Sequence, residues 1–149
     1  MPLELGVETL VPLPVALPLV GAAVALAAAR RPGLRRAVSV TVLSLLVAVS
    51  VALLFASDAR GPLVVEVGGW PAPAGVVLVV DRLAALMLVV SSVIQLGLVL
   101  YSVGQGRASD DEESDGEAPL PIFHPTMLVL AAGVSNTFVS GDLFNLYVG

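Results

Sequence analysis

The sequence contains no cysteine and no lysine, and only 13% of its residues are charged. Without cysteine the chain can form neither a disulfide nor a thiolate metal site, and thiol catalysis is excluded. Soluble globular domains carry roughly a quarter charged residues, so this low charge, with 57% hydrophobic residues, indicates a membrane protein. The few arginines form no basic face that could neutralise phosphates, so nucleic acid is not an expected partner.

Long apolar segments dominate the chain and are predicted to cross the lipid bilayer as helices. A membrane-crossing helix needs about 20 apolar residues. The predicted spans are residues 10–29, 37–56, 83–102 and 122–140, and residues 143–149 begin a fifth apolar helix. We therefore predict an all-α polytopic membrane protein, a single membrane domain with four transmembrane helices and the stub of a fifth.

The first apolar segment has a second interpretation as a cleaved signal peptide, because Ala27-Ala28-Ala29 resembles a cleavage site. A signal peptide needs a positively charged stretch before its apolar region. Here Glu4 and Glu8 precede it, without lysine or arginine. The sequence therefore favours a helix that stays in the protein.

A cluster of arginines sets the predicted orientation in the membrane. Arg30, Arg31, Arg35 and Arg36 fall in the short connection between the first two spans. Short connections rich in arginine remain in the cytoplasm. A phosphate or nucleic-acid site is the alternative meaning of such a cluster. The orientation predicts a multi-pass protein of the cell membrane with its N-terminus outside.

A β-hairpin is predicted between the second and third spans, on the external side. Residues 63–67 and 76–80 are rich in β-branched residues and flank a stretch of glycine and proline around Trp70. Trp70 is expected at the membrane–water interface. Asp81 is expected to cap the third span, with Arg82 as an interfacial anchor.

Two features within the spans predict contacts between helices. Gln95, a strongly polar side chain in the third span, is expected to form an interhelical hydrogen bond. Small residues at every fourth position let helix backbones approach closely, although such stripes also arise by chance in an alanine-rich background. They are Gly21, Ala25 and Ala29 in the first span, and Ser44, Ala48, Ala52 and Ala56 in the second.

Residues 104–121 carry most of the net negative charge, with six acidic residues and one arginine. A calcium loop that began at Asp111 would need a bidentate glutamate at its twelfth position, where the chain has Ile122. A calcium site is therefore rejected. The run of like charge is predicted to be a solvated, disordered cytoplasmic loop.

The groups that an ion carrier needs are missing from the spans. Carriers place ionisable side chains near the middle of the membrane, whereas the four predicted spans contain no Asp, Glu, Lys or Arg. His124, the only histidine, is the single weak titratable candidate, and a solvated or capping side chain is favoured for it. No phosphate loop, catalytic triad, metal cluster or cofactor site is present, so enzymatic activity is not expected.

Three stretches of the chain resemble a known family. They are Gly68 to Asp81, Leu128 to Gly133, and Ser140-Gly141-Asp142-Leu143-Phe144-Asn145-Leu146-Tyr147-Val148. The pattern resembles the N-terminal portion of the D-type subunit of the Mrp-type multisubunit Na⁺/H⁺ antiporters. That protein is similar to the antiporter-like proton-pumping subunits of respiratory complex I.

The resemblance implies a many-helix membrane protein with an external N-terminus and an external hairpin, assembled with other antiporter subunits and moving H⁺ and Na⁺. Gly141, Asp142, Phe144 and Asn145 are its motif residues, with a structural role. The family pattern continues with two phenylalanines and the glutamate that carries protons, whereas Gly149 is the last residue here.

The expected function is therefore a truncated part of a D-type antiporter subunit, inactive alone because it lacks the buried glutamate and lysines. The alternative is a small structural or assembly membrane protein that packs against antiporter subunits. A soluble binding module is a weaker third hypothesis.

Overall fold

The computed structural model describes residue 6 and residues 9–28, 30–67, 69–70, 74–104, 123–141 and 143–148. Helices make up most of this part of the chain, and one small two-stranded sheet accompanies them. The elements are α2 (Leu13–Ala27), α3 (Pro32–Arg60), β1 (Leu63–Val67), β2 (Val76–Val80), α4 (Arg82–Gly104), α5 (Phe123–Val139) and α6 (Leu143–Val148). The predicted order of helices and hairpin is confirmed.

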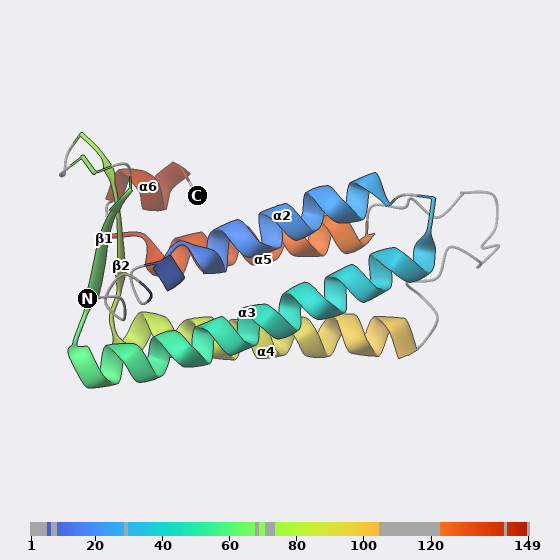
Figure 1. The fold of residues 1–149 in the computed structure, drawn as a ribbon, viewed down its shortest axis with the longest axis horizontal. Helices are drawn as coiled ribbons and strands as arrows, with labels where there is room; N and C mark the ends of the chain where they lie inside the picture. Colours follow the sequence, from blue (N-terminus) through green and yellow to red (C-terminus); the bar gives the residue numbers. More distant parts are fainter. Residues whose placement is uncertain are drawn as a thin grey trace.

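The four long helices lie side by side and alternate in direction (Figure 1). Helix α2 packs on α5 and α3, α3 packs on α4, and α4 contacts α5. One core cluster draws residues from all four helices, so the bundle has a shared interior. Its buried members are Ala22, Ala25, Leu43, Leu46, Val99, Leu128 and Ala131.

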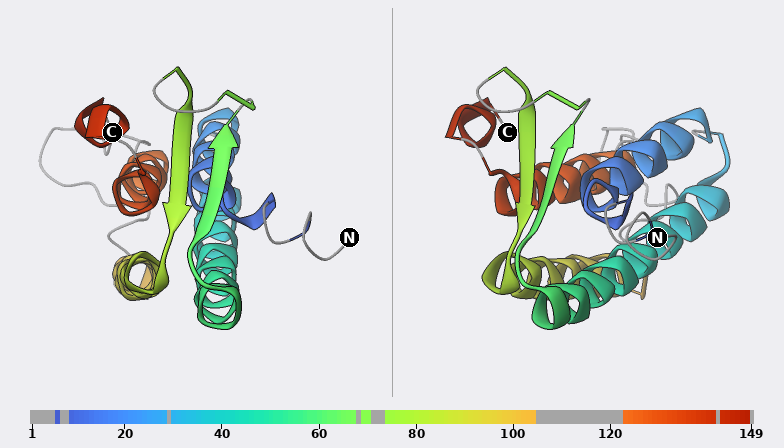
Figure 2. Two further views of the ribbon diagram at one scale, coloured as in Figure 1. Left: turned by 90° about the vertical axis from the view of Figure 1, so that its left-hand side faces the viewer. Right: turned by 60° about the vertical axis from the view of Figure 1, so that its left-hand side comes forward.

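The hairpin lies across one end of this bundle (Figure 2). Its strands pair antiparallel, with Leu63 opposite Val80 and Val67 opposite Val76. The strands occupy the two β-branched runs that the sequence predicted. Leu78 and Val80 point inward onto a second core cluster, which includes Leu53, Leu88 and Val139. The hairpin therefore covers apolar ends of α3, α4 and α5.

Asp81 begins α4 as predicted. The backbone N–H of Ala84 donates to the Asp81 carboxylate at 2.7 Å, and the N–H of Ala85 donates to the Asp81 carbonyl at 2.9 Å. A side chain that accepts from the first turn satisfies an otherwise unpaired helix donor. The N-cap prediction is confirmed, and α4 agrees with the predicted span 83–102 within two residues at each end.

Helix α3 is longer than predicted, with 29 residues from Pro32 to Arg60 instead of residues 37–56. Proline is well suited to the first turn of a helix, because its fixed φ is helical and its missing N–H would be unpaired there. Pro32 therefore starts the helix rather than interrupting it. Arg35 and Arg36 lie on α3, and their predicted place in a connecting segment is wrong.

Helix length distinguishes α3 and α4 from the other two long helices. Residues Gly33–Arg60 and α4 are long and apolar enough to cross a membrane, whereas α2 has 15 residues and α5 has 17. At 1.5 Å per residue, α2 and α5 extend roughly 22 and 26 Å. Both are shorter than the hydrocarbon core of about 30 Å.

The two stripes of small residues have different surroundings. Gly21 and Ala25 are buried in the bundle, and a Cβ added to Gly21 would stand 2.7 Å from a Val42 methyl group. The close approach predicted for α2 is therefore confirmed at Gly21. On α3, Ser44, Ala48 and Ala52 are exposed. Ala56, the fourth member of that stripe, is half-buried. The exposed members lie outside the interior of the bundle, and the helix contact predicted for them stays a prediction.

Candidate functional site

Serine hydroxyls in the bundle bond to their own helices. The Ser50 hydroxyl donates to the Leu46 carbonyl at 2.7 Å, and the Ser92 hydroxyl donates to the Val89 carbonyl at 3.0 Å. A hydroxyl bonded three or four residues back is satisfied locally and does not link one helix to another. Ser50 and Ser92 therefore add no interhelical step to a proton path.

Gln95 lies on the buried face of α4, with only 8% of its surface exposed. Its amide oxygen has no hydrogen-bond partner among the residues that the structure describes. The interhelical hydrogen bond that the sequence predicted is not formed by this atom. A buried acceptor without a donor costs roughly 1–3 kcal/mol, so the Gln95 amide is expected to destabilise the bundle.

His124 is buried in the first turn of α5, with 3% of its surface exposed. Its imidazole meets the Phe123 ring edge to face, with ring centroids 5.2 Å apart. The expectation of a solvated side chain is therefore wrong, whereas the capping role named with it stays a prediction. Pro125 and Leu128 are buried on the same helix, and this places His124 on the face that α5 turns toward the bundle.

Arg35 is equally buried, at 3% exposure, and Ser39 is fully buried one turn later on α3. Val38, Val103 and Met127 pack around one core cluster, so the starts of α3 and α5 and the end of α4 meet at one end of the bundle. This end holds both Arg35 and His124. The burial of Arg35 was not predicted, although its spacing of four from Ser39 places both residues on one helix face.

The opposite end of the bundle carries an exposed ion pair. Arg82 at the start of α4 is bonded to Asp58 near the end of α3, and their side chains are 71% and 60% exposed. Exposed pairs contribute about 1 kcal/mol or less. Asp58, Asp81 and Arg82 line an open hollow of about 630 Å³. Exposed side chains of both charges line this hollow, which fits an interfacial anchor rather than a catalytic site.

Gly141 connects the end of α5 to the free edge of β2. Its backbone N–H donates to the Val77 carbonyl at 2.9 Å, and Ser140 forms an isolated antiparallel bridge with Leu78. A Cβ on Gly141 would stand 2.5 Å from a Val79 methyl group and 3.0 Å from the Val77 oxygen. The close approach of two backbones therefore explains glycine at this position.

Of the remaining motif residues, the structure describes the backbone of Phe144 and Asn145 but not Asp142. Asp142 lies outside the described residues. Phe144 and Asn145 lie in α6, which forms the helix expected at residues 143–149. Tyr147 and Leu143 of α6 are 91% and 82% exposed, so these side chains make little contact with the bundle.

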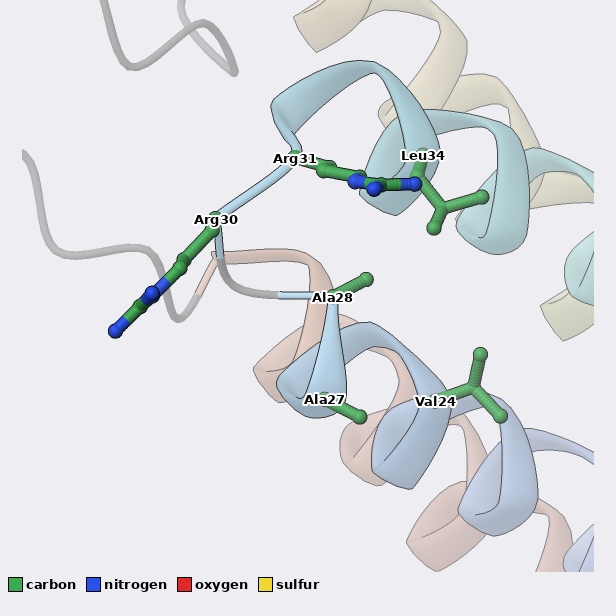
Figure 3. A pocket seen from close by; sticks show the side chains of 6 residues that line it. All are labelled: Val24, Ala27, Ala28, Arg30, Arg31 and Leu34. Carbon is green, nitrogen blue, oxygen red and sulfur yellow. The ribbon is translucent and has the colours of Figure 1, made fainter.

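Arg30 and Arg31 lie at the connection of α2 to α3, at the same end as Arg35. Figure 3 shows Arg30 extending outward from the connection and Arg31 lying over the first turns of α3. Both side chains line an open cleft of about 520 Å³, together with apolar side chains that include Val24 and Leu34. The cleft is cationic at its outer end and apolar where it meets the helices.

Within the described part of the chain, no group of three or more His, Asp or Glu side chains could hold a metal ion. The acidic loop predicted at residues 104–121 lies, apart from Gly104, outside the described residues. The described bundle therefore offers packing surfaces and a cationic cleft as its candidate functional features.

No family model matches the chain. Two curated relatives are D-type antiporter subunits. A probable K⁺/H⁺ antiporter D subunit of Rhizobium meliloti is 40% identical over 85 residues, which cover 57% of this chain and 14% of that protein. The Na⁺/H⁺ antiporter D subunit of Alkalihalophilus pseudofirmus is 32% identical over 141 residues, which cover 95% of this chain and 27% of that protein.

A solved structure of the Mrp complex from Dietzia sp. contains a chain with the same fold. The match has a TM-score of 0.83 and 31% sequence identity, and it covers 95% of this chain and 24% of that chain. The chain thus spans 27% or less of the length of these relatives. The similarity extends over the helices and the hairpin together.

Proposed function

The chain belongs to the family of Mrp-type antiporter D subunits, of which it represents a part, and from this premise we propose that it supplies framework helices to a monovalent cation/proton antiporter. In this proposal α2, α3, α4 and α5 all cross the cell membrane. The chain does not exchange ions by itself and carries out no enzymatic reaction.

The observation that supports this proposal is the distribution of charged residues along the helices. Helices α2 and α5 contain no Asp, Glu, Lys or Arg, and the only such residue of α4 is Arg82 at its start. In α3, Arg35 and Arg36 lie in the first turns, whereas Asp58 and Arg60 lie in the last. Ion carriers need ionisable groups at mid-membrane depth. The bundle supports packing, not proton transfer.

The proposed topology places the end with Arg30, Arg31, Arg35 and Arg36 in the cytoplasm, following the preference of arginine-rich short connections. The N-terminus and the hairpin are then outside. The shorter helices α2 and α5 are accommodated by local thinning of the bilayer, which costs fractions of a kcal/mol per Å of mismatch.

Transport by the isolated chain is the direct test. We expect vesicles that contain the purified full chain and a pH-sensitive dye to show no pH change under an imposed Na⁺ or K⁺ gradient beyond that of protein-free vesicles. An ionophore that exchanges the same cation for H⁺ should produce the change in the same vesicles, which checks that they are sealed. A cation-dependent signal above the protein-free level would overturn the proposal.

The second candidate function is an assembly role, in which the chain packs against other antiporter subunits. The observation that favours it is the outward-facing stripe of Ser44, Ala48 and Ala52 on α3, since small residues let another helix approach closely. The solved relative is part of a multisubunit complex. The chain would then contribute its surface rather than a chemical group.

For the assembly role, we expect antiporter subunits to be recovered with the tagged full chain from membranes that contain them. Ala48→Phe should reduce that recovery, because a large ring separates the helix backbones. Leu45→Phe is the matched control, since Leu45 is exposed on α3 and already large. Recovery of the chain alone, or equal recovery with both variants, would contradict this role.

A further inference from the structure

Two open hollows lie next to each other between α2 and α3. The outer hollow, of about 520 Å³, contains Arg30 and Arg31 (Figure 3). The inner hollow, of about 360 Å³, runs along both helices past Gly21. Val24 and Leu34 line both hollows. The two hollows therefore adjoin, and together they make a cleft that extends from the charged connection to the apolar flanks of the helices.

The inner part of the cleft is apolar and open. Thr41 is the only polar residue among those that line it. Gly21 has no side chain, and the Val42 methyl group opposite comes so close that α2 and α3 meet at the floor of the groove. Val20, on the wall of the groove, is 63% exposed. In a membrane, such a groove accepts an acyl chain.

The outer part of the cleft is cationic. Within the part of the chain that the structure describes, neither Arg30 nor Arg31 has an ion-pair partner. Guanidinium groups bind phosphate oxygens with two parallel hydrogen bonds. The first N–H groups of α3 lie at the same end, and the helix dipole there also favours an anion.

We propose that this cleft binds one anionic glycerophospholipid, with its phosphate at Arg30 and Arg31 and one acyl chain between Gly21 and Leu34. Basic clefts between membrane helices suit anionic headgroups. A free phosphate would use only the outer half of the cleft, and a neutral lipid only the inner half. The inference requires that the chain lies in a membrane, and it is independent of the transport proposal.

Native mass spectrometry of the purified full chain tests headgroup recognition, with phosphatidylglycerol and phosphatidylcholine of the same acyl chains as probes. We expect one phosphatidylglycerol bound per chain, preferred over phosphatidylcholine by about tenfold or more, because two arginines act on one phosphate. The double variant Arg30→Gln, Arg31→Gln should lose that preference. Arg60→Gln, an exposed arginine at the other end of α3, should keep it.

A second pair of variants tests the acyl groove without changing charge. Ala37→Trp fills the groove and should prevent lipid retention, whereas Ala59→Trp, at an exposed position of α3 outside the groove, should not. If the arginine double variant does not purify as a folded chain, the two tryptophan variants decide whether the cleft binds the lipid. Equal retention of both lipids, equal retention by both tryptophan variants, or displacement of the lipid by inorganic phosphate alone would overturn the proposal.

Discussion

Replacing Gly141 with valine is expected to lower the free energy of unfolding by about 1–3 kcal/mol, the usual cost of forcing extra atoms into a well-packed contact. The new Cβ would stand 2.5 Å from a Val79 methyl group and 3.0 Å from the Val77 carbonyl oxygen. The oxygen belongs to the backbone of β2 and cannot rotate away. This clash can therefore be relieved only if the segment after α5 separates from the hairpin.

That separation has a local signature. The hydrogen bond from the Gly141 N–H to the Val77 carbonyl should break, and amide exchange across residues 76–80 should accelerate because the hairpin loses its contact with α5. Unfolding in mixed micelles and hydrogen exchange measured by mass spectrometry are the two readouts. Gly141→Ala should give a smaller loss of the same kind.

Gly97→Val is the matched control for this prediction. Gly97 is an exposed glycine of α4, and a Cβ added there meets nothing within 4 Å. Valine at that position should leave hairpin exchange unchanged and should not destabilise the chain, because glycine is the poorer helix former. Equal stability and equal exchange of the two valine variants would refute a packing role for Gly141.

The sequence predicted correctly those elements that are bounded by turn-forming or helix-capping residues. The hairpin follows from two β-branched runs on either side of a glycine- and proline-rich stretch. The start of α4 follows from Asp81, a carboxylate placed directly before an apolar run. Both signals act within a few residues, so no knowledge of the tertiary fold was needed.

The sequence did not predict which face of each helix lies inside. When a helix is apolar on all sides, its periodicity does not distinguish a face toward lipid from a face toward protein. For this reason the sequence left open which helix would approach the stripe of Ser44, Ala48 and Ala52, which the structure shows facing outward. The burial of Arg35 and His124 also depends on how three helix ends meet, which no single segment encodes.

Gln95 is another residue whose surroundings in the bundle the sequence did not predict. A glutamine in a membrane helix is expected to find a partner on a neighbouring helix. The structure instead buries Gln95, with its amide oxygen unbonded within the described part of the chain. Exchange of that amide for an apolar group of similar shape should therefore stabilise the bundle.

Gln95→Met is expected to raise the free energy of unfolding by about 1–3 kcal/mol, because methionine matches the length of glutamine and removes an unsatisfied buried acceptor. The measurement is reversible unfolding of the full chain in mixed micelles. Ser50→Ala is the matched control, since its buried hydroxyl is already bonded to the Leu46 carbonyl at 2.7 Å. The control should show no gain. A Met variant that is no more stable than the parent chain would mean that the amide oxygen is satisfied in solution, for instance by a buried water molecule.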